Sequence, residues 1–140
     1  MQRGDFSILT KEEVDLVRKA IKYRQNAYAP YSNFQVGAAL LTDSGKVYLG
    51  ANVENASYGL TVCAERIAAF KAVNDGERKF KVIAVVADTE EPVAPCGACR
   101  QVLREFGPNM KVIMANVSGD ILIATLDELL PVSFGPESLE

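Results

Sequence analysis

The chain has 140 residues, of which 49% are hydrophobic and 24% charged, and its formal net charge is −3. These values are ordinary for a globular protein, and we expect residues 1–140 to form one domain with a buried core. The acidic balance argues against a nucleic-acid partner. The absence of a run of about 18 apolar residues argues against a membrane span. The first ten residues lack the apolar core of a secretory signal.

The first half of the chain predicts a helix, an antiparallel hairpin and a second helix. Thr10 and Glu13 form a capping box at the start of the first helix. Apolar residues then recur at helical spacing, and an Asp-Ser-Gly turn separates the two apolar strands of the hairpin. The predicted elements are Thr10–Gln25, Val36–Thr42, Val47–Asn52 and Cys63–Asn74.

The second half predicts a central strand, a helix, two further strands and a short helix. Lys81–Ala87 is a nearly continuous apolar run, typical of a strand buried on both faces. The connection over 117–120 is too short for a crossover, so the last two strands are expected to be antiparallel. The other predicted elements are Gly97–Phe106, Lys111–Asn116, Ile121–Thr125 and Leu126–Leu130. Together they predict an α/β fold with a five-stranded mixed sheet and an antiparallel hairpin at each end of the chain.

The tail has little core of its own to join. Pro131 ends the last short helix, and Gly135-Pro136 is expected to prevent another from starting. Phe134 is therefore an apolar ring on an irregular segment. On the sequence alone, we expect it to fold back onto its own chain.

The only three cysteines lie in two motifs, Cys63-Ala64-Glu65 and Pro95-Cys96-Gly97-Ala98-Cys99, and the chain has no histidine. Three thiolates occupy three corners of a zinc tetrahedron and leave the fourth for water, which is the layout of a catalytic zinc. Glu65, two residues after the first thiolate, is placed to carry protons to and from that water. This is the pattern of zinc deaminases.

Each cysteine falls at a predicted helix N-terminus, where the helix dipole and free amides favour the thiolate. Zinc with three thiolates has a net charge of −1, which weakens the metal as an acid for its water. Arg66 and Arg100 directly follow the two motifs. A guanidinium that donates to the sulfurs would withdraw this charge.

Other interpretations of these motifs stay open. Cys96 and Cys99 also fit a redox dithiol, which leaves the first motif unexplained. Cys63 alone fits a buried core thiol, and Glu65 alone fits an exposed helix residue. A structural zinc would need an acidic fourth ligand. Three cysteines cannot pair completely, so we expect no disulfide framework and a reducing, cytoplasmic location.

A second group of polar residues follows the first hairpin. Asn52 and Glu54 in Asn52-Val53-Glu54-Asn55-Ala56 present an amide and a carboxylate that suit sugar hydroxyls. An Asn-rich loop cap explains the same residues equally well. Phe34, just before the first strand, is either a core residue or a platform on which a base stacks.

Taken together, these motifs resemble the small, homotetrameric cytidine deaminases. The similarity covers nearly the whole chain, and beyond the cysteine motifs it includes Ala29–Leu41, Asn52–Ala56, Arg100–Val102, Glu128–Pro131 and Phe134. The cysteine motifs alone indicate only the deaminase superfamily. Asn52 with Glu54, added to the three-cysteine set, is the more specific part. The resemblance implies a three-layer α/β/α fold.

The resemblance also implies an activity. Cytidine and 2'-deoxycytidine would be deaminated by water to uridine and 2'-deoxyuridine plus ammonia, in pyrimidine salvage. One Zn²⁺ per chain would be held by Cys63, Cys96 and Cys99. Glu65 would carry protons among the water, N3 of the base and the departing ammonia.

The remaining implied roles concern the substrate and the partner subunit. Ala64 would donate its backbone N–H to the base carbonyl, and Arg66 would tune the thiolates. The implied nucleoside contacts are Phe34 stacking on the base and Asn52 and Glu54 on the ribose 3'-hydroxyl. In the homotetramer, Phe134 would reach into the site of a neighbouring subunit.

Three other functions fit part of the sequence. A deaminase of nucleic acid fits poorly with the acidic charge and with the short connection between the last two strands. A deaminase of a nucleoside antibiotic such as blasticidin S shares the zinc motifs, but Asn52 and Glu54 favour a plain nucleoside. A non-catalytic zinc-binding or redox module is the third.

Overall fold

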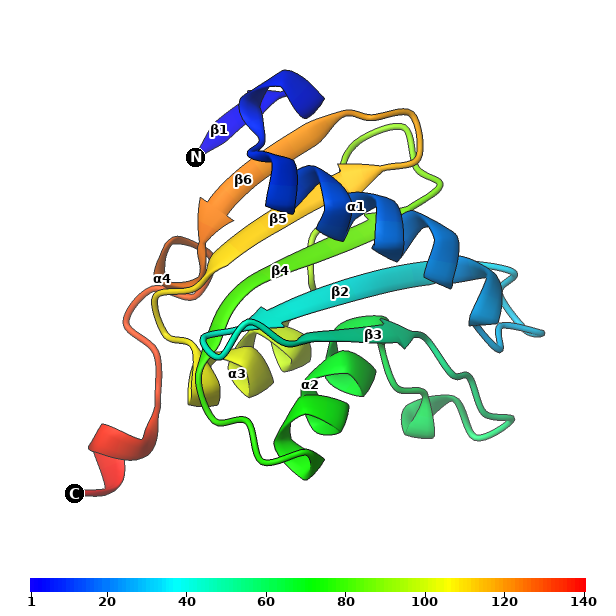
Figure 1. Ribbon diagram of the computed structural model, residues 1–140. Coiled ribbons are helices and arrows are strands. Elements are labelled where there is room, and N and C mark those ends of the chain that lie inside the picture. The colour runs from blue at the N-terminus through cyan, green and yellow to red at the C-terminus, as the bar shows by residue number, and fades with distance from the viewer.

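The computed structural model describes all residues 1–140 and shows one mixed sheet with helices on both faces (Figure 1). The six strands follow the order β1-β6-β5-β4-β2-β3. The strands are β1 (Gln2–Gly4), β2 (Val36–Thr42), β3 (Val47–Ala51), β4 (Phe80–Ala87), β5 (Lys111–Asn116) and β6 (Ile121–Thr125). The α-helices are α1 (Lys11–Tyr23), α2 (Ala64–Asn74), α3 (Gly97–Phe106) and α4 (Leu126–Leu129).

The predicted α/β fold with a mixed sheet is confirmed, but the prediction of five strands is wrong. The sixth strand, β1, pairs antiparallel with β6, with Arg3 opposite Leu122. All three residues of β1 are exposed, and the segment Gln-Arg-Gly has no apolar alternation. Such an edge strand forms because β6 offers it hydrogen-bonding partners, so it leaves no pattern in its own residues.

Both predicted antiparallel pairs are present. β2 pairs antiparallel with β3, and β5 with β6. β4 lies in the centre, antiparallel to β2 and parallel to β5. The single parallel pair needs a crossover, and α3 lies on the connection between β4 and β5.

The two faces of the sheet bury separate apolar clusters. α1 covers one face and contributes Leu16, Val17 and Ala20. α2 and α3 cover the opposite face, where Ala68 and Leu103 join the other cluster (Figure 1). Successive residues of the central strands alternate between the clusters, which gives three layers and explains why these strands are apolar throughout.

A glycine sets how closely α2 approaches the sheet. A Cβ atom at Gly50 on β3 would lie 2.2 Å from the carbonyl oxygen of Ala64, the first residue of α2. No side chain fits at that distance. The N-terminus of α2 is therefore seated directly on the end of β3.

The predicted boundaries hold at several helix ends and fail at the tail. The capping box of α1 is confirmed, since Glu13 N donates to Thr10 Oγ1 and Thr10 N donates to the Glu13 carboxylate. The expectation that Gly135-Pro136 prevents a helix is wrong, because a 3₁₀-helix covers Pro136–Leu139. Proline is accepted there because the first helical N–H has no intrahelical partner. None of the helices has the length and apolarity needed to cross a membrane.

Candidate active site

The three cysteines converge where α2 and α3 begin. Cys63 is the N-cap residue of α2, Cys96 is the N-cap residue of α3, and Cys99 lies in the first turn of α3. Their sulfur atoms all lie within 4.8 Å of one another, and those of Cys63 and Cys96 are 3.8 Å apart. Zinc–sulfur bonds of about 2.3 Å place tetrahedral thiolates about 3.8 Å apart. The set therefore fits three corners of a zinc site, whereas a disulfide requires about 2.05 Å.

The protein alone already favours a thiolate in this cluster. A hydrogen bond from Cys99 is the main cause that lowers the pKa of Cys63 to about 5, and Arg66 adds a second donor. Arg66 Nη2 lies 3.6 Å from the Cys63 sulfur. The same contact with Cys63, together with burial, raises the pKa of Cys99. The thiol of Cys63 therefore ionises more readily than that of Cys99.

The two arginines that follow the motifs have different partners. Arg66 contacts Cys63 as expected, and its buried Nε has no hydrogen-bond partner within the chain. Arg100 does not reach a sulfur atom. Its Nε donates to Pro95 O at 2.8 Å and its Nη1 to Leu129 O at 2.7 Å. It ties the loop before Cys96 to the end of α4, so our expectation for Arg100 is wrong.

Glu65 lies beside the cluster in the first turn of α2 and is only 4% exposed. Burial is the main cause that raises the pKa of its carboxyl to about 7, and the charge of Cys63 adds to the effect. An exposed surface role is thereby excluded for Glu65. A carboxyl group with a pKa near neutrality can both accept and return a proton at physiological pH.

Ala64, between Cys63 and Glu65, is fully buried. It is the first residue of α2, so its backbone N–H has no intrahelical acceptor. The amide is therefore available to an acceptor at the N-terminus of this helix. Gly50 fixes the position of Ala64 through the close contact described above.

Asn52 makes two hydrogen bonds to the loop that carries Phe34. Asn52 Oδ1 accepts from Val36 N, and Asn52 Nδ2 donates to Phe34 O, both at 2.8 Å. The side chain is buried, with 7% of its surface exposed. An amide has two donor and two acceptor positions, so one of each remains. Asn52 therefore holds the loop and keeps limited capacity for a ligand.

Glu54 binds the same loop and is half-buried rather than buried. Its carboxylate accepts hydrogen bonds from the Ser32 hydroxyl, from Ser32 N at 3.2 Å and from Tyr31 N at 3.0 Å. The Ser32 hydroxyl is the main cause that holds the pKa of Glu54 below its usual range. Glu54 is therefore ionised at neutral pH.

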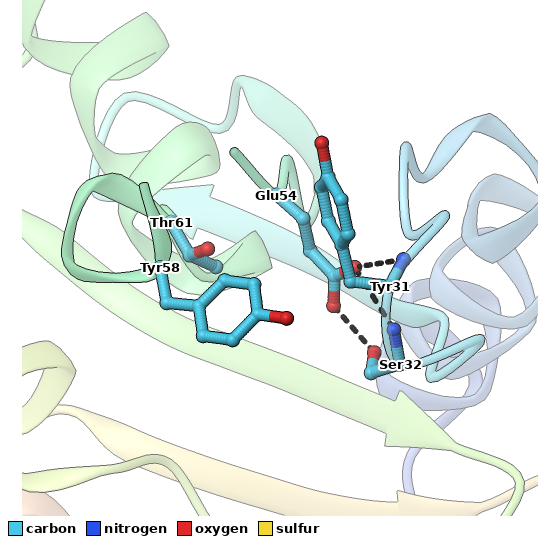
Figure 2. Close-up of a pocket in the computed structure, with 5 residues that line it drawn as sticks. All are labelled: Tyr31, Ser32, Glu54, Tyr58 and Thr61. Carbon is cyan, nitrogen blue, oxygen red and sulfur yellow. Dashed lines mark hydrogen bonds between the residues drawn. The ribbon is translucent and has the colours of Figure 1, made fainter. Parts of the chain in front are cut away.

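Glu54 lines a cavity of about 380 Å³ together with four residues to which the sequence motifs assign no role. Figure 2 shows the carboxylate pointing toward Ser32, with the ring of Tyr58 on the other side of the cavity. The tilted rings of Tyr31 and Tyr58 have centroids 5.8 Å apart. The four missed lining residues are Tyr31, Ser32, Tyr58 and Thr61. Their two segments meet only through folding, so sequence spacing carries no signal for them.

Backbone pairing joins this cavity to the cysteine cluster. Val53 and Val62 form an antiparallel bridge with two hydrogen bonds of 2.9 Å. Glu54 thus follows a residue paired with Val62, and Cys63 follows Val62. Glu54, whose carboxylate suits a sugar hydroxyl, and Cys63, which suits a metal ion, are therefore brought close to each other by this pairing.

The two phenylalanines of interest are both exposed. Phe34 is 40% exposed and Phe134 is 59% exposed, so neither is a core residue, and the expectation that Phe134 folds back onto its own core is wrong. The tail is instead held on α3, where Gln101 Nε2 donates to Phe134 O at 2.9 Å. Figure 1 shows it leaving near α4, at the end of the molecule away from the β3–α2 loop. Phe134 is not among the residues that line the cavity.

The comparisons with known proteins agree on one family. The family model "Cytidine and deoxycytidylate deaminase zinc-binding region" matches residues 10–116. A cytidine deaminase of Halalkalibacterium halodurans is 58% identical over 125 residues, which cover 89% of this chain and 95% of the relative. One of Sporosarcina psychrophila is 55% identical, covering 89% and 92%. A crystal structure of cytidine deaminase from Burkholderia pseudomallei matches with a TM-score of 0.85 and 52% identity, covering 90% and 100%.

These similarities extend far beyond the two cysteine motifs. Each relative is covered almost completely, and the structural match covers 90% of this chain. The geometry agrees with them, since three thiols and a buried carboxyl meet at two helix N-termini. This chain is a metal-binding hydrolase that belongs to the cytidine deaminase family.

Proposed function

We propose that this enzyme deaminates cytidine and 2'-deoxycytidine, yielding uridine or 2'-deoxyuridine and ammonia, as a step of pyrimidine salvage. One observation carries the proposal: the buried carboxyl of Glu65 adjoins three convergent thiols. The water oxygen forms a bond to C4 of the base, and the bond from C4 to the amino nitrogen breaks. The nitrogen leaves as ammonia, so the atoms of water and nucleoside balance.

One Zn²⁺ per chain would be held by Cys63, Cys96 and Cys99, whose sulfur spacing fits it. When bound, zinc supplies a water acidic enough to ionise near neutral pH. Glu65 accepts a proton from the reacting water and delivers protons to N3 and to the leaving nitrogen. Arg66 stabilises the Cys63 thiolate by donating to it.

The exposed ring and the free polar groups of the site support the proposed substrate contacts. Phe34 stacks on the pyrimidine, and the Ala64 N–H binds the base carbonyl. Asn52 and Glu54 bind the ribose 3'-hydroxyl through their remaining hydrogen-bonding capacity. The ionised Glu54 repels a phosphate, and residues 53–57 contain no Lys or Arg to offset it.

The active enzyme is a homotetramer of one-domain subunits (residues 1–140) in the cytoplasm, and each site is completed by Phe134 of a neighbouring subunit. Two observations support this: the ring is exposed, and the tail is tied to α3 away from its own cavity. An exposed ring held on a fixed segment suits insertion into a second copy. The three free cysteines fit a reducing compartment.

An absorbance assay tests the activity with cytidine, 2'-deoxycytidine, CMP, dCMP and a short single-stranded DNA. We expect turnover of the two nucleosides and little turnover of the other three. Elemental analysis of protein never exposed to chelator should find one zinc per chain. Comparable rates with CMP and cytidine, or active protein with far less zinc, would contradict the proposal.

Complementation tests the shared site. Glu65→Ala disables a chain's own site, whereas Phe134→Ala damages only the site of its neighbour. Co-expressed mixed oligomers contain some sites with both residues intact, so their activity should exceed the sum of the two separate variants. If Phe134→Ala is impaired alone and mixing restores nothing, Phe134 serves its own chain.

A further inference from the structure

The hydroxyl of Ser32 connects two residues that the proposed function assigns to different parts of the substrate. It donates its single proton to Glu54 Oε2 and accepts a hydrogen bond from Phe34 N at 3.0 Å. Figure 2 shows this hydroxyl joined to the Glu54 carboxylate by a dashed line. One side chain thus touches both the carboxylate assigned to the ribose and the backbone of the residue assigned to the base.

The contacts of Ser32 also decide what Glu54 can still bind. An ionised carboxylate has about four acceptor positions. Two on Oε1 are taken by Tyr31 N and Ser32 N, and one on Oε2 by the Ser32 hydroxyl. About one position on Oε2 remains, with its direction fixed because the carboxylate cannot rotate without breaking the other bonds. Such a carboxylate is prepared for a single hydroxyl donor.

The backbone of Phe34 is held from both ends. Phe34 N is bound to Ser32, and Phe34 O accepts from Asn52 Nδ2. The preceding residue, Asn33, has a φ of 59°, in the left-handed region. Asparagine tolerates this conformation better than most residues. The ring, which is 40% exposed, therefore projects from a turn whose backbone is fixed on both sides.

We propose that Ser32 is a positioning residue that couples recognition of the ribose 3'-hydroxyl to placement of the base-stacking Phe34. The inference rests on the proposed function, in which Glu54 binds the 3'-hydroxyl and Phe34 stacks on the base. Ser32 contacts neither the reacting atoms nor the metal ligands. It acts through Glu54 and Phe34.

The experiment compares kcat/KM for cytidine and 3'-deoxycytidine in four proteins. Wild type should prefer cytidine by at least about tenfold, since a hydrogen bond to a charged group contributes roughly 1.5–3 kcal/mol. Ser32→Ala should reduce this preference by about tenfold, whereas Ser32→Thr, which keeps the hydroxyl, should stay within about threefold of wild type. The matched control is Ser118→Ala, since Ser118 is exposed in the β5–β6 turn and its hydroxyl makes no hydrogen bond.

Two readouts separate positioning from a general structural effect. Calorimetry of uridine and 3'-deoxyuridine should show the same loss of discrimination in Ser32→Ala without relying on turnover. A double-mutant cycle should show that Ser32→Ala reduces kcat/KM for cytidine less in a Phe34→Ala background than in wild type, by about threefold or more. Zinc content and melting temperature should match those of wild type, because Ser32 is exposed.

The outcomes distinguish this inference from the function on which it rests. If wild type does not deaminate cytidine or ignores the 3'-hydroxyl, the proposed function of the site fails and the inference fails with it. If wild type discriminates and Ser32→Ala discriminates equally well, only the inference is overturned. If Ser32→Ala does not fold, the test rests on folded Ser32→Thr. A Ser32→Thr protein that prefers cytidine over 3'-deoxycytidine as wild type does supports the inference, and one that has lost this preference overturns it.

Discussion

The helix on one face of the sheet and those on the other begin in different ways. α1 starts with a complete capping box, in which Thr10 and Glu13 satisfy each other's backbone N–H groups, and Lys111 pairs with the buried Glu13 at 2.7 Å. α2 and α3 start at Cys63 and Cys96, neither of which makes a side-chain capping bond. A good N-cap contributes about 1 kcal/mol. The helices that bear the proposed metal ligands lack this contribution.

The helices on the two faces also differ in the size of the side chains that they bury. α1 buries the large side chains Leu16 and Val17, whereas the buried stripe of α2 is mainly alanine. Small side chains let a helix lie close to the sheet. Close approach on Gly50 fixes where α2 begins and therefore where Cys63 and Glu65 lie. On one face the helix start is capped by side chains, whereas on the other the helix starts carry the cysteines and Glu65 of the candidate site.

The largest expected effect is the loss of turnover in Glu65→Gln. Glutamine has nearly the same shape but cannot accept and return a proton, and general acid–base catalysis contributes about 10²–10⁴-fold. We expect kcat to fall by at least about 10²-fold, whereas the zinc content and the fold are retained. Steady-state kinetics with elemental analysis measures this. A variant that keeps a third of the wild-type activity would show that Glu65 is not the proton carrier.

The same residue should make the stability of chelator-treated protein depend on pH. Burial raises the pKa of Glu65 from 4.5 to about 7. Its contribution to stability is therefore fully present below about pH 4.5 and is lost as the pH rises through 7. Relative to Glu65→Gln, wild type should lose about 3 kcal/mol between pH 4 and pH 8. Urea unfolding at several pH values tests this, and a constant difference between the two proteins would contradict it.

On the opposite face, Thr10→Ala should affect stability and leave the site unchanged. Removing the N-cap hydroxyl breaks half of the capping box, so the free energy of unfolding should fall by about 1 kcal/mol. The kcat/KM for cytidine should stay within about twofold of wild type. A loss of activity without a loss of stability would show that the start of α1 acts on the candidate site and not on stability.

The smallest expected effect concerns the start of α2 at Cys63. Serine is a better N-cap than cysteine, so Cys63→Ser should stabilise chelator-treated protein by roughly 0.5–1 kcal/mol. The same variant should lose zinc and activity, because a hydroxyl is a poor substitute for a thiolate ligand. Thermal unfolding in the presence of chelator measures the gain. A lower melting temperature than that of chelated wild type would show that Cys63 stabilises the fold in some other way.

The amino-acid pattern is enough to predict the features that depend on residues close together in the sequence. The starts of α2 and α3 and the place of the cysteines on them follow from the local apolar pattern, which involves residues within about one helical turn. The hairpins follow from strand alternation and short turns. The resemblance to the family rests on short contiguous motifs, namely the two cysteine motifs together with Asn52 and Glu54.

Contacts between segments far apart in the sequence are seen only in the folded structure. Residues of β1 bond to β6, more than a hundred positions away, and nothing in their own pattern records it. Arg100 is adjacent to Cys99 but bonds to Pro95 and Leu129, because direction in space, not adjacency, selects its partners. The pKa of Glu65 depends on burial, which a sequence pattern does not express. The cavity around Glu54 exists because two loops meet, and such encounters are set by the packing of the whole chain.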